Sequence, residues 1–412
     1  MKRNSLTFLM LLTVSPIVMS QSLTLEQIID TGLNRSLVLE TESENIKIKE
    51  LEKIDADRLR WPSLNLSAST SNSNLENQSA SASIGVNQPL YQGGSISTQQ
   101  NIADVELKKA ALNLLRKKQT LVKDLQLAYI DILEAKALTE EEKLSLTRLQ
   151  EQARISKILY SEGDVWKNDA LQADVSIAQG ETQVIAAENK ILRSKSNLNV
   201  LLNYEIDQTI DVLGELVWKK QDWSWGQIRK TVEEKHPELM IAKINEDIAN
   251  LRINVQRASN RPTVNLSSAL SQSESFTGSS SGATNLSVTL SANWTFWDGG
   301  NINRAISASR IEKQKASFAL HNQRQSILKQ AQLSWLSLNE AASQVSVLKQ
   351  AIGIAQENYR VNTVRYQEKL GTANDLLTAQ TLLSKSKKDW LSALARYAKA
   401  VYTLKFNMGE GS

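Results

Sequence analysis

An internal repeat limits the folds open to this chain more than any other feature of its sequence. Residues 62–67 match 262–267 at an offset of 200, and residues 93–135 match 299–341 at an offset of 206, with 13 identities among 43 positions. A repeat of roughly 185 residues is far longer than a solenoid module. The sequence therefore predicts two copies of one half-domain, at 21–203 and 227–409, in a pseudo-twofold architecture.

Each copy contains a segment almost without charge. From residue 63 to 103 the one acidic or basic side chain is Glu76, and from 262 to 297 it is Glu274, in a chain that is 22% charged. In both segments apolar residues alternate with Ser, Asn and Thr at a period of two, as in β-strands. We expect hairpins over 63–90 and 263–297, with strands of about ten residues and with Glu76 and Glu274 in the connecting loops.

Strands with one apolar face and one small polar face are typical of outer-membrane barrels, whose lipid-facing and lumenal sides alternate. Four strands do not close, and an open edge in lipid leaves backbone groups unpaired at several kcal/mol each. Two chains would give eight strands filled by side chains, and three would give twelve with a lumen. A soluble sandwich is the alternative. The expected fold class is mainly α-helical with a membrane β-barrel to which each chain contributes four strands.

Aromatic residues lie at the strand ends that point away from the predicted loops. Trp61, Tyr91, Trp294 and Trp297 occupy these positions. Tryptophan and tyrosine gather at the interface between membrane and water. We expect these four side chains to form an aromatic girdle at one membrane interface.

The rest of each copy has a helical pattern. Residues 95–160 and 301–366 each span 66 positions, a length of roughly 100 Å as helix, and each is followed by a turn and a returning helix that ends near Asn203 or Gly409. Shorter helices are expected through 23–60 and 227–260. Residues that break helices mark the predicted junctions between helix and strand: Pro62, Pro89, Gly93, Gly94, Pro262, Gly299 and Gly300.

The two ends of the chain and its middle are different in composition. Residues 1–20 carry two basic residues, a short apolar run and small residues near Ser20, which predicts a cleaved secretory signal. Residues 204–226 form a polar linker with Trp218, Trp223 and Trp225, which we expect to pack a small equatorial domain against the helices in preference to forming a binding patch. Residues 410–412 are a short tail.

Several classes of function find no support in the sequence. The chain has no cysteine and two histidines, His236 and His321, which we expect to be structural, so no metal site or cofactor is predicted. Residues 278–282 match G-x-S-x-G but lie in a Ser/Gly loop without the strand and helix that a nucleophile elbow needs. The formal charge of +4 does not indicate a nucleic-acid partner. We expect a protein that is not an enzyme.

The duplicated halves carry motifs that resemble the TolC family of outer-membrane efflux proteins. These are the strand-end segments 91–94 and 297–300, and the segments that begin at Tyr160 and Tyr366 and run through Asp169 and Asp375. The resemblance covers about residues 22–409. It implies a homotrimer in which long coiled-coil helices form a periplasmic α-barrel of twelve helices, continuous with a twelve-stranded barrel in the outer membrane of a Gram-negative bacterium.

The same resemblance implies a passive exit duct for efflux or type I secretion, with its gate at the periplasmic helix tips. The partners that it implies are an inner-membrane pump and a periplasmic adaptor, because the chain has no GxxxxGK[ST] phosphate loop of its own. A trimeric surface adhesin or a structural outer-membrane protein is the alternative function. An adhesin of that kind keeps its strands together at the C-terminus, whereas here they are split by some 200 residues.

The predicted gate residues are Gly163 and Asp169 at the first tip, and Arg365, Lys369, Gly371 and Asp375 at the second. A threefold ring of Asp169 or Asp375 would favour cations in the lumen. The alternative for both acids is a helix N-terminal role through the helix dipole. Lys369 stands where the family usually has glycine, and Gly371 follows two residues later. Arg365 and Lys369 are expected to tether the second tip by ion pairs.

Overall fold

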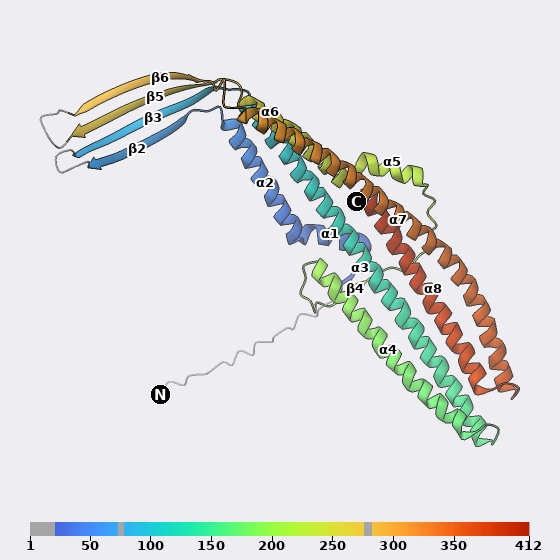
Figure 1. Ribbon diagram of the computed structural model, residues 1–412. Helices are drawn as coiled ribbons and strands as arrows, with labels where there is room; N and C mark the ends of the chain where they lie inside the picture. The colour runs from blue at the N-terminus through green and yellow to red at the C-terminus, as the bar shows by residue number, and fades with distance from the viewer. Residues whose placement is uncertain (1–20, 73–77, 276–281, 412) are drawn as a thin grey trace, which may run out of the picture. The chain divides into compact units, whose positions relative to one another are not determined.

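A computed structural model describes residues 21–72, 78–275 and 282–411. The predicted signal segment 1–20, Glu76 and most of the Ser/Gly loop lie outside the described residues. The two halves of the chain have the same order of elements (Figure 1). The first half comprises β1 Gln21–Leu23, α1 Leu25–Arg35, α2 Leu37–Arg58, β2 Ser63–Asn72, β3 Gln78–Gln92, α3 Ser95–Ser161 and α4 Lys167–Leu201.

The second half repeats this order, and the short strand β4 takes the place of β1. Its elements are β4 Ile210–Val212, α5 Trp225–Lys235, α6 Pro237–Ala258, β5 Thr263–Ser275, β6 Ala283–Asn293, α7 Asn301–Gln367 and α8 Ala373–Asn407. The chain forms two compact units, and each unit takes segments from both halves. One comprises residues 1–36, 124–220 and 339–402, and the other comprises 37–123, 221–338 and 403–412.

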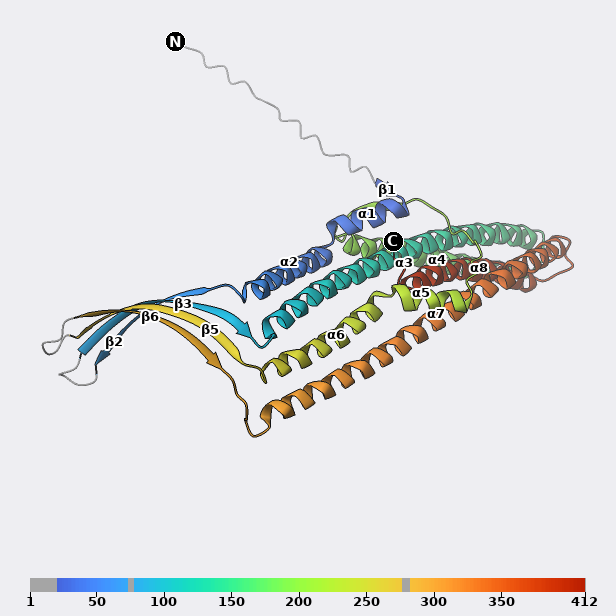
Figure 2. The ribbon, with the colours of Figure 1, turned by 90° about the horizontal axis from the view of Figure 1, so that it is seen from above.

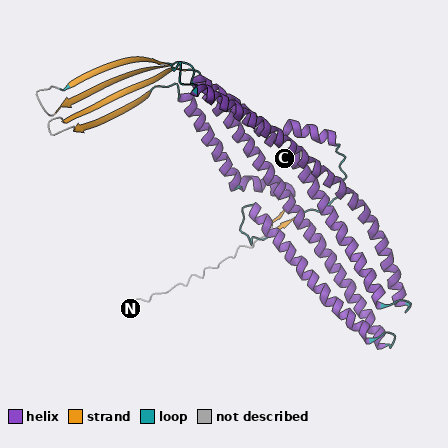
Figure 3. Cartoon of the chain, viewed as in Figure 1, coloured by secondary structure: helices purple, strands orange, loops and turns teal. Residues whose placement is uncertain are grey.

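The long helices agree closely with the sequence prediction. α3 and α7 each have 67 residues, against the predicted 66, and the helices that return from the tips end at Leu201 and Asn407 (Figure 3). They are continuous because no proline occurs within them. None of the described helices combines the length and the apolarity needed to cross a bilayer.

The shorter helices differ from the prediction because each is broken in two. α1 ends before Ser36 and α5 ends before His236, and both of these residues have extended backbone angles. Pro237 explains the second break, since a residue before proline is excluded from the helical region and proline is favoured at the first helical position. The first break has no proline. Matching capping boxes, Thr24 with Gln27 and Ser224 with Gln227, begin α1 and α5.

The four long strands form one antiparallel sheet in the order β2-β3-β5-β6, so the two predicted hairpins lie side by side (Figure 2). Leu66, Ile84, Leu270 and Leu286 are in register across the four strands and share one face. The next row, Ser67, Ser83, Ser271 and Asn285, lies on the other face. Leu66 is 76% exposed, and in the single chain the apolar face has no covering layer within the described residues.

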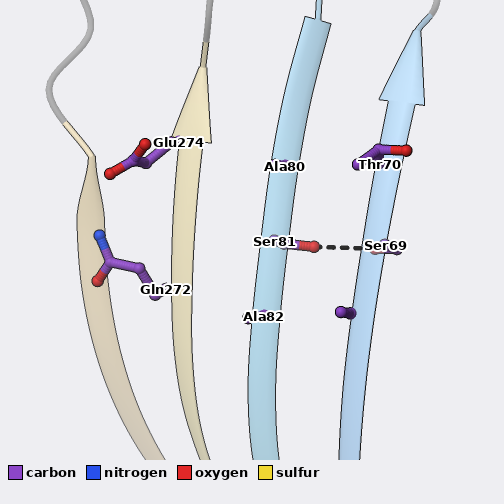
Figure 4. Close-up of a pocket in the computed structure, with 8 residues that line it drawn as sticks. Ser69, Thr70, Ala80, Ser81, Ala82, Gln272 and Glu274 are labelled. Atoms are coloured by element: carbon purple, nitrogen blue, oxygen red, sulfur yellow. Dashed lines mark hydrogen bonds between the residues drawn. The ribbon is translucent and has the colours of Figure 1, made fainter.

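The polar face is a ladder of hydroxyl groups. Ser67 and Ser83, and Ser71 and Ser79, form cross-strand hydrogen bonds at 2.8 Å. Ser69 and Ser81 form the bond between these two, at 2.9 Å (Figure 4). Such pairs stabilise the register of the hairpin. Because successive side chains alternate between faces, this hydroxyl surface stays separate from the leucine-rich face.

The strand ends differ from the prediction in three places. Glu274 lies within β5, paired with Ala80 on the apolar side, and not in the connecting loop. β6 ends at Asn293, so Trp294 and Phe296 follow the strand and do not belong to it. β3 extends through Pro89 to Gln92, which places Pro89 inside a strand and not at a junction.

Pro89 is tolerated within β3 because it adjoins a bulge. The register with β5 shifts between Pro89 and Tyr91, which leaves Leu90 without a partner in the ladder. Proline has no N–H to donate, and within sheets it is confined to edges and bulges. The shift pairs Tyr91 with Val264 and so places the tyrosine on the apolar face.

The linker 204–226 packs on helices at separate points in the two units. In one unit β4 pairs in parallel with β1, and the Tyr129 hydroxyl donates to the Leu213 carbonyl at 2.6 Å. In the other unit the Trp335 indole donates to the Trp223 carbonyl at 2.8 Å and stacks at a tilt on Trp225. Trp223 and Trp225 thus contact α7 through Trp335, whereas the equatorial domain that we expected this segment to form stays a prediction.

The two glycine pairs at the junctions give a matched test of backbone constraint. Gly93 has φ +63° and a Cβ there would meet the Ala258 carbonyl oxygen at 2.4 Å, whereas Gly299 has φ +68° and open space around it. We expect Gly93→Ala to lower the free energy of unfolding by clearly more than Gly299→Ala, which should lose only the ~1–2 kcal/mol of left-handed strain. Chemical unfolding of both variants measures the difference. Equal losses would contradict this account of Gly93.

Candidate gate at the helix tips

The two helix tips have the same backbone turn. At the first tip the N–H of Gly163 bonds to Tyr160 and that of Asp164 to Leu159; at the second, Lys369 bonds to Tyr366 and Leu370 to Arg365. Gly163 has φ +82° and Lys369 has φ +62°. Lys369 therefore occupies the left-handed position that glycine usually fills at a helix C-terminus. Gly371, which follows two residues later, is not in the left-handed region, so it does not replace the missing glycine.

An ion pair joins the two tips. Lys369 Nζ lies 2.6 Å from Asp164 Oδ2, and this hydrogen bond raises the pKa of the lysine. The sequence predicted that Lys369 forms an ion pair but did not identify Asp164. Arg365 instead donates to the Leu370 carbonyl at 3.3 Å within its own tip.

A small buried core lies beneath this ion pair. Leu159 and Tyr366 pack with Ala373 and Leu376, so both tips contribute to one cluster. The Tyr366 hydroxyl is 2.8 Å from the Ser156 hydroxyl, and both residues are almost completely buried. The repeat drew attention to Tyr366, but no sequence signal marked Ser156, because its importance comes only from its position opposite the tyrosine.

Asp375 caps the helix that returns from the second tip. Its backbone N–H donates to the Thr372 hydroxyl at 3.1 Å, and its carboxylate accepts the Thr372 N–H at 3.2 Å. Hydrogen bonds from Thr372, with Arg365 nearby, hold the pKa of Asp375 below its usual value. This geometry is the helix N-terminal role that the sequence left as an alternative.

Asp169 lies in the equivalent first turn of α4. The residue before that helix is Trp166, whose side chain makes no capping bond. The negative charge of Asp169 therefore interacts favourably with the dipole of α4. It lacks the pair of hydrogen bonds that Asp375 forms with Thr372. Whether either acid faces a lumen stays a prediction.

A polar seam between α3 and α8 continues from the tips. Glu141 is buried, 2.5 Å from Arg148 and 3.5 Å from Lys387, and Ser145 bonds to Ser384 at 2.9 Å. Buried charges of this kind are costly to separate, because removing one partner leaves the other uncompensated. The two helices are thus held together by polar groups that the sequence analysis did not single out.

The predicted interface aromatics all lie near the helix-proximal end of the sheet, in the unit that carries the strands. Trp61 is 66% exposed beside Arg58, and Trp297 is 80% exposed. The Trp294 indole bonds to the Asn260 carbonyl at 3.3 Å. Pro62 and Pro262 directly precede β2 and β5, and the two glycine pairs directly precede α3 and α7, as expected.

Both histidines were expected to be structural. His236 is 2% exposed at the break between α5 and α6, and its Nδ1 has no partner within the described residues. Burial, aided by the nearby Arg116, lowers the pKa of His236 to about 4. Among the described residues no group of three potential metal ligands occurs.

The strain and ion pair at Lys369 can be separated by two substitutions. Lys369→Gly loses the bond to Asp164 but relieves the left-handed strain, whereas Lys369→Ala loses the bond and keeps about 1–2 kcal/mol of strain. We expect the glycine variant to have the higher thermal stability of the two, as measured by circular dichroism. The order would be reversed if the turn were not left-handed in solution.

His236 should make stability depend on pH. The unfolded histidine gains a proton below pH ~6.5, and the folded one gains it only near pH 4, so stability is full above 6.5 and is lost as the pH falls towards 4. The difference amounts to roughly 3 kcal/mol. Thermal melts of His236→Gln should show a weaker loss over this range, and His321→Gln, at an exposed site, should behave like the parent chain. Parallel pH profiles for His236→Gln and the parent would refute the assignment.

Comparison with known proteins supports this architecture. The family model described as "Outer membrane efflux protein" matches residues 51–204 and 229–410. The outer membrane efflux protein BepC of Brucella suis biovar 1 (strain 1330) is 21% identical over 316 residues, which cover 74% of this chain and 68% of BepC. The outer membrane protein TolC of Escherichia coli (strain K12) is 23% identical over 308 residues, 71% of this chain but only 62% of TolC.

The fold is also shared with solved structures. The outer membrane protein VceC from Vibrio cholerae superposes with a TM-score of 0.81 at 17% identity, over 94% of this chain and 96% of that one. The outer membrane channel CmeC of Campylobacter jejuni gives a TM-score of 0.80 at 14% identity, over 94% and 86%. The duplicated halves, the paired hairpins and the family match together establish that the chain belongs to the outer membrane efflux protein family.

Proposed function

We propose that this protein is the outer-membrane exit duct of an export system, assembled as a homotrimer and gated at its periplasmic helix tips. The observation that carries this proposal is the four-stranded sheet. β2 and β6 are its edges, and its apolar face is exposed, with Leu64, Val288 and Leu290 each at least 66% accessible. Lipid accepts such a face but not the open edges. Copies of the same sheet, joined edge to edge, satisfy both requirements, and three give twelve strands.

The helical edges supply a second reason to expect copies. α4 has an exposed stripe of residues separated by multiples of seven, formed by Leu171, Ile185 and Leu192. In the same unit α7 has another, at seven-residue spacing, formed by Val347, Ile354 and Val361. Apolar residues at this spacing are typical of coiled-coil contacts. A stripe of one copy can pack on the other stripe of the next, and this head-to-tail contact closes into a ring.

The tip contacts favour a closed state in the isolated chain. The Lys369–Asp164 pair joins the α7–α8 turn to the α3–α4 turn, and the Tyr366–Ser156 bond joins α7 to α3. Opening the tips would break both contacts. The exposed ion pair contributes little, so the buried hydroxyl pair and the cluster around Tyr366 should carry most of the resistance to opening.

The energy for export must come from partners. The chain has no phosphate-binding loop. An inner-membrane pump would therefore supply the energy, and a periplasmic adaptor would contact the duct. This assignment follows from the family and from the efflux function named for BepC. We propose that the protein itself performs no catalysis and that its contribution is a water-filled path.

Single-channel recording tests the duct. The purified protein in planar bilayers should give small, gated currents, and the double variant Lys369→Ala, Tyr366→Phe should open several-fold more often because both links between the tips are lost. Lys385→Ala removes an exposed pair within α8 only and should leave gating unchanged. If neither the parent nor the double variant conducts, the duct function is refuted.

The assembly is tested at the stripe on α7. Ile354→Glu places a charge in the proposed contact, and Gln356→Glu places one on the same helix two residues away. We expect the first to shift the protein from trimer to monomer in native mass spectrometry and the second to leave the trimer intact. A trimer of unchanged stability in Ile354→Glu would contradict the proposed helical interface.

A further inference from the structure

A groove of about 810 Å³ lies between α3, α6 and α7, entirely within the unit that carries the strands. Apolar side chains from all three helices line it, among them Ile102, Ile248, Val255 and Ala316. Its volume is in the range of sites that take small organic molecules. The two walls, α3 and α7, are equivalent segments of the two repeats, and α6 lies between them.

The charges of the two walls are balanced. Glu106 pairs with Lys109 on α3 at 3.7 Å, and the equivalent Glu312 pairs with Lys315 on α7 at 2.9 Å. Each acid therefore has a cation on its own helix. The walls offer an apolar surface with no net charge.

Arg252 on α6 breaks this balance. It lines the groove, its side chain is exposed, and in the described part of the chain no carboxylate pairs with it. At the offset of 200 the equivalent residue in the first repeat is Glu52, which pairs with Lys49. The unpaired positive charge at this position is thus not shared by the two repeats.

We propose that the groove binds an anionic amphiphile, with its alkyl chain on the apolar walls and its carboxylate or sulfate head on Arg252. A guanidinium binds such heads through two parallel hydrogen bonds. The ligand is a cargo molecule in transit, so this inference rests on the proposed duct function and names a substrate class for it. A cationic amphiphile of the same length gains the apolar contact but is repelled by the arginine.

The binding test uses the trimer in amphipol and two probes, decanoate and decyltrimethylammonium, titrated by calorimetry. We expect saturable binding of decanoate that is about tenfold weaker in Arg252→Gln, about 1.4 kcal/mol, and lost in Ala319→Trp, which fills the groove. Arg257→Gln, on the same helix but outside the groove, is the matched control and should bind like the parent. Equal affinity for both probes, or no effect of Arg252→Gln, would overturn the proposal.

A second measurement separates this inference from the duct function. Decanoate added to single channels should reduce the current of the parent and of Arg257→Gln but not of Arg252→Gln. Absence of any current would refute the duct itself. Normal currents without an Arg252-dependent block would refute the cargo assignment and leave the duct in place.

Discussion

The backbone groups at the two open edges of the β-sheet must find hydrogen-bond partners, and this requirement limits how the protein can be assembled. One chain supplies four strands with a leucine-rich face and a hydroxyl face, and both outer edges are open. In water these edges could be solvated, but an apolar face of this size would stay exposed. In lipid the face is stable and the edges are not. The edge-to-edge association of identical sheets that we propose removes both penalties.

The two repeats share the sheet equally. Each repeat contributes one hairpin, and β3 pairs with β5 to join them, in one register from Ser79 to Pro89 of β3. The bulge after Pro89 then turns Tyr91 onto the apolar face. Glu274 lies on that same face near the far end of β5 (Figure 4). The apolar face thus has a charged side chain near one end and aromatic side chains near the other, and their place at membrane interfaces stays a prediction.

The helix tips show how a repeat can keep a shape while its residues change. Gly163 and Lys369 occupy the same left-handed position, although only one is glycine. Lys369 has a strained left-handed backbone, and in this conformation its amine forms an ion pair with Asp164 on the neighbouring turn. Beneath it, Tyr366 fills a buried site against Ser156. The two repeats therefore share the same backbone turn, and the residues that differ between them form the contact between the two tips.

Local patterns in the sequence were enough to predict the long helices and the two hairpins. Periodicity, the repeat and the placement of proline and glycine predicted α3 and α7 to within one or two residues, because long helices and alternating strands are local patterns. What it missed depends on neighbours distant in sequence. Glu274 belongs to a strand because β3 extends opposite it. Ser156 is important because the Tyr366 hydroxyl faces it. Arg252 has no carboxylate partner in the described part of the chain because the acidic residues that line the groove on α3 and α7 pair with lysines of their own helices. Only the tertiary structure brings these groups together, since no local signal records which residue lies across a contact.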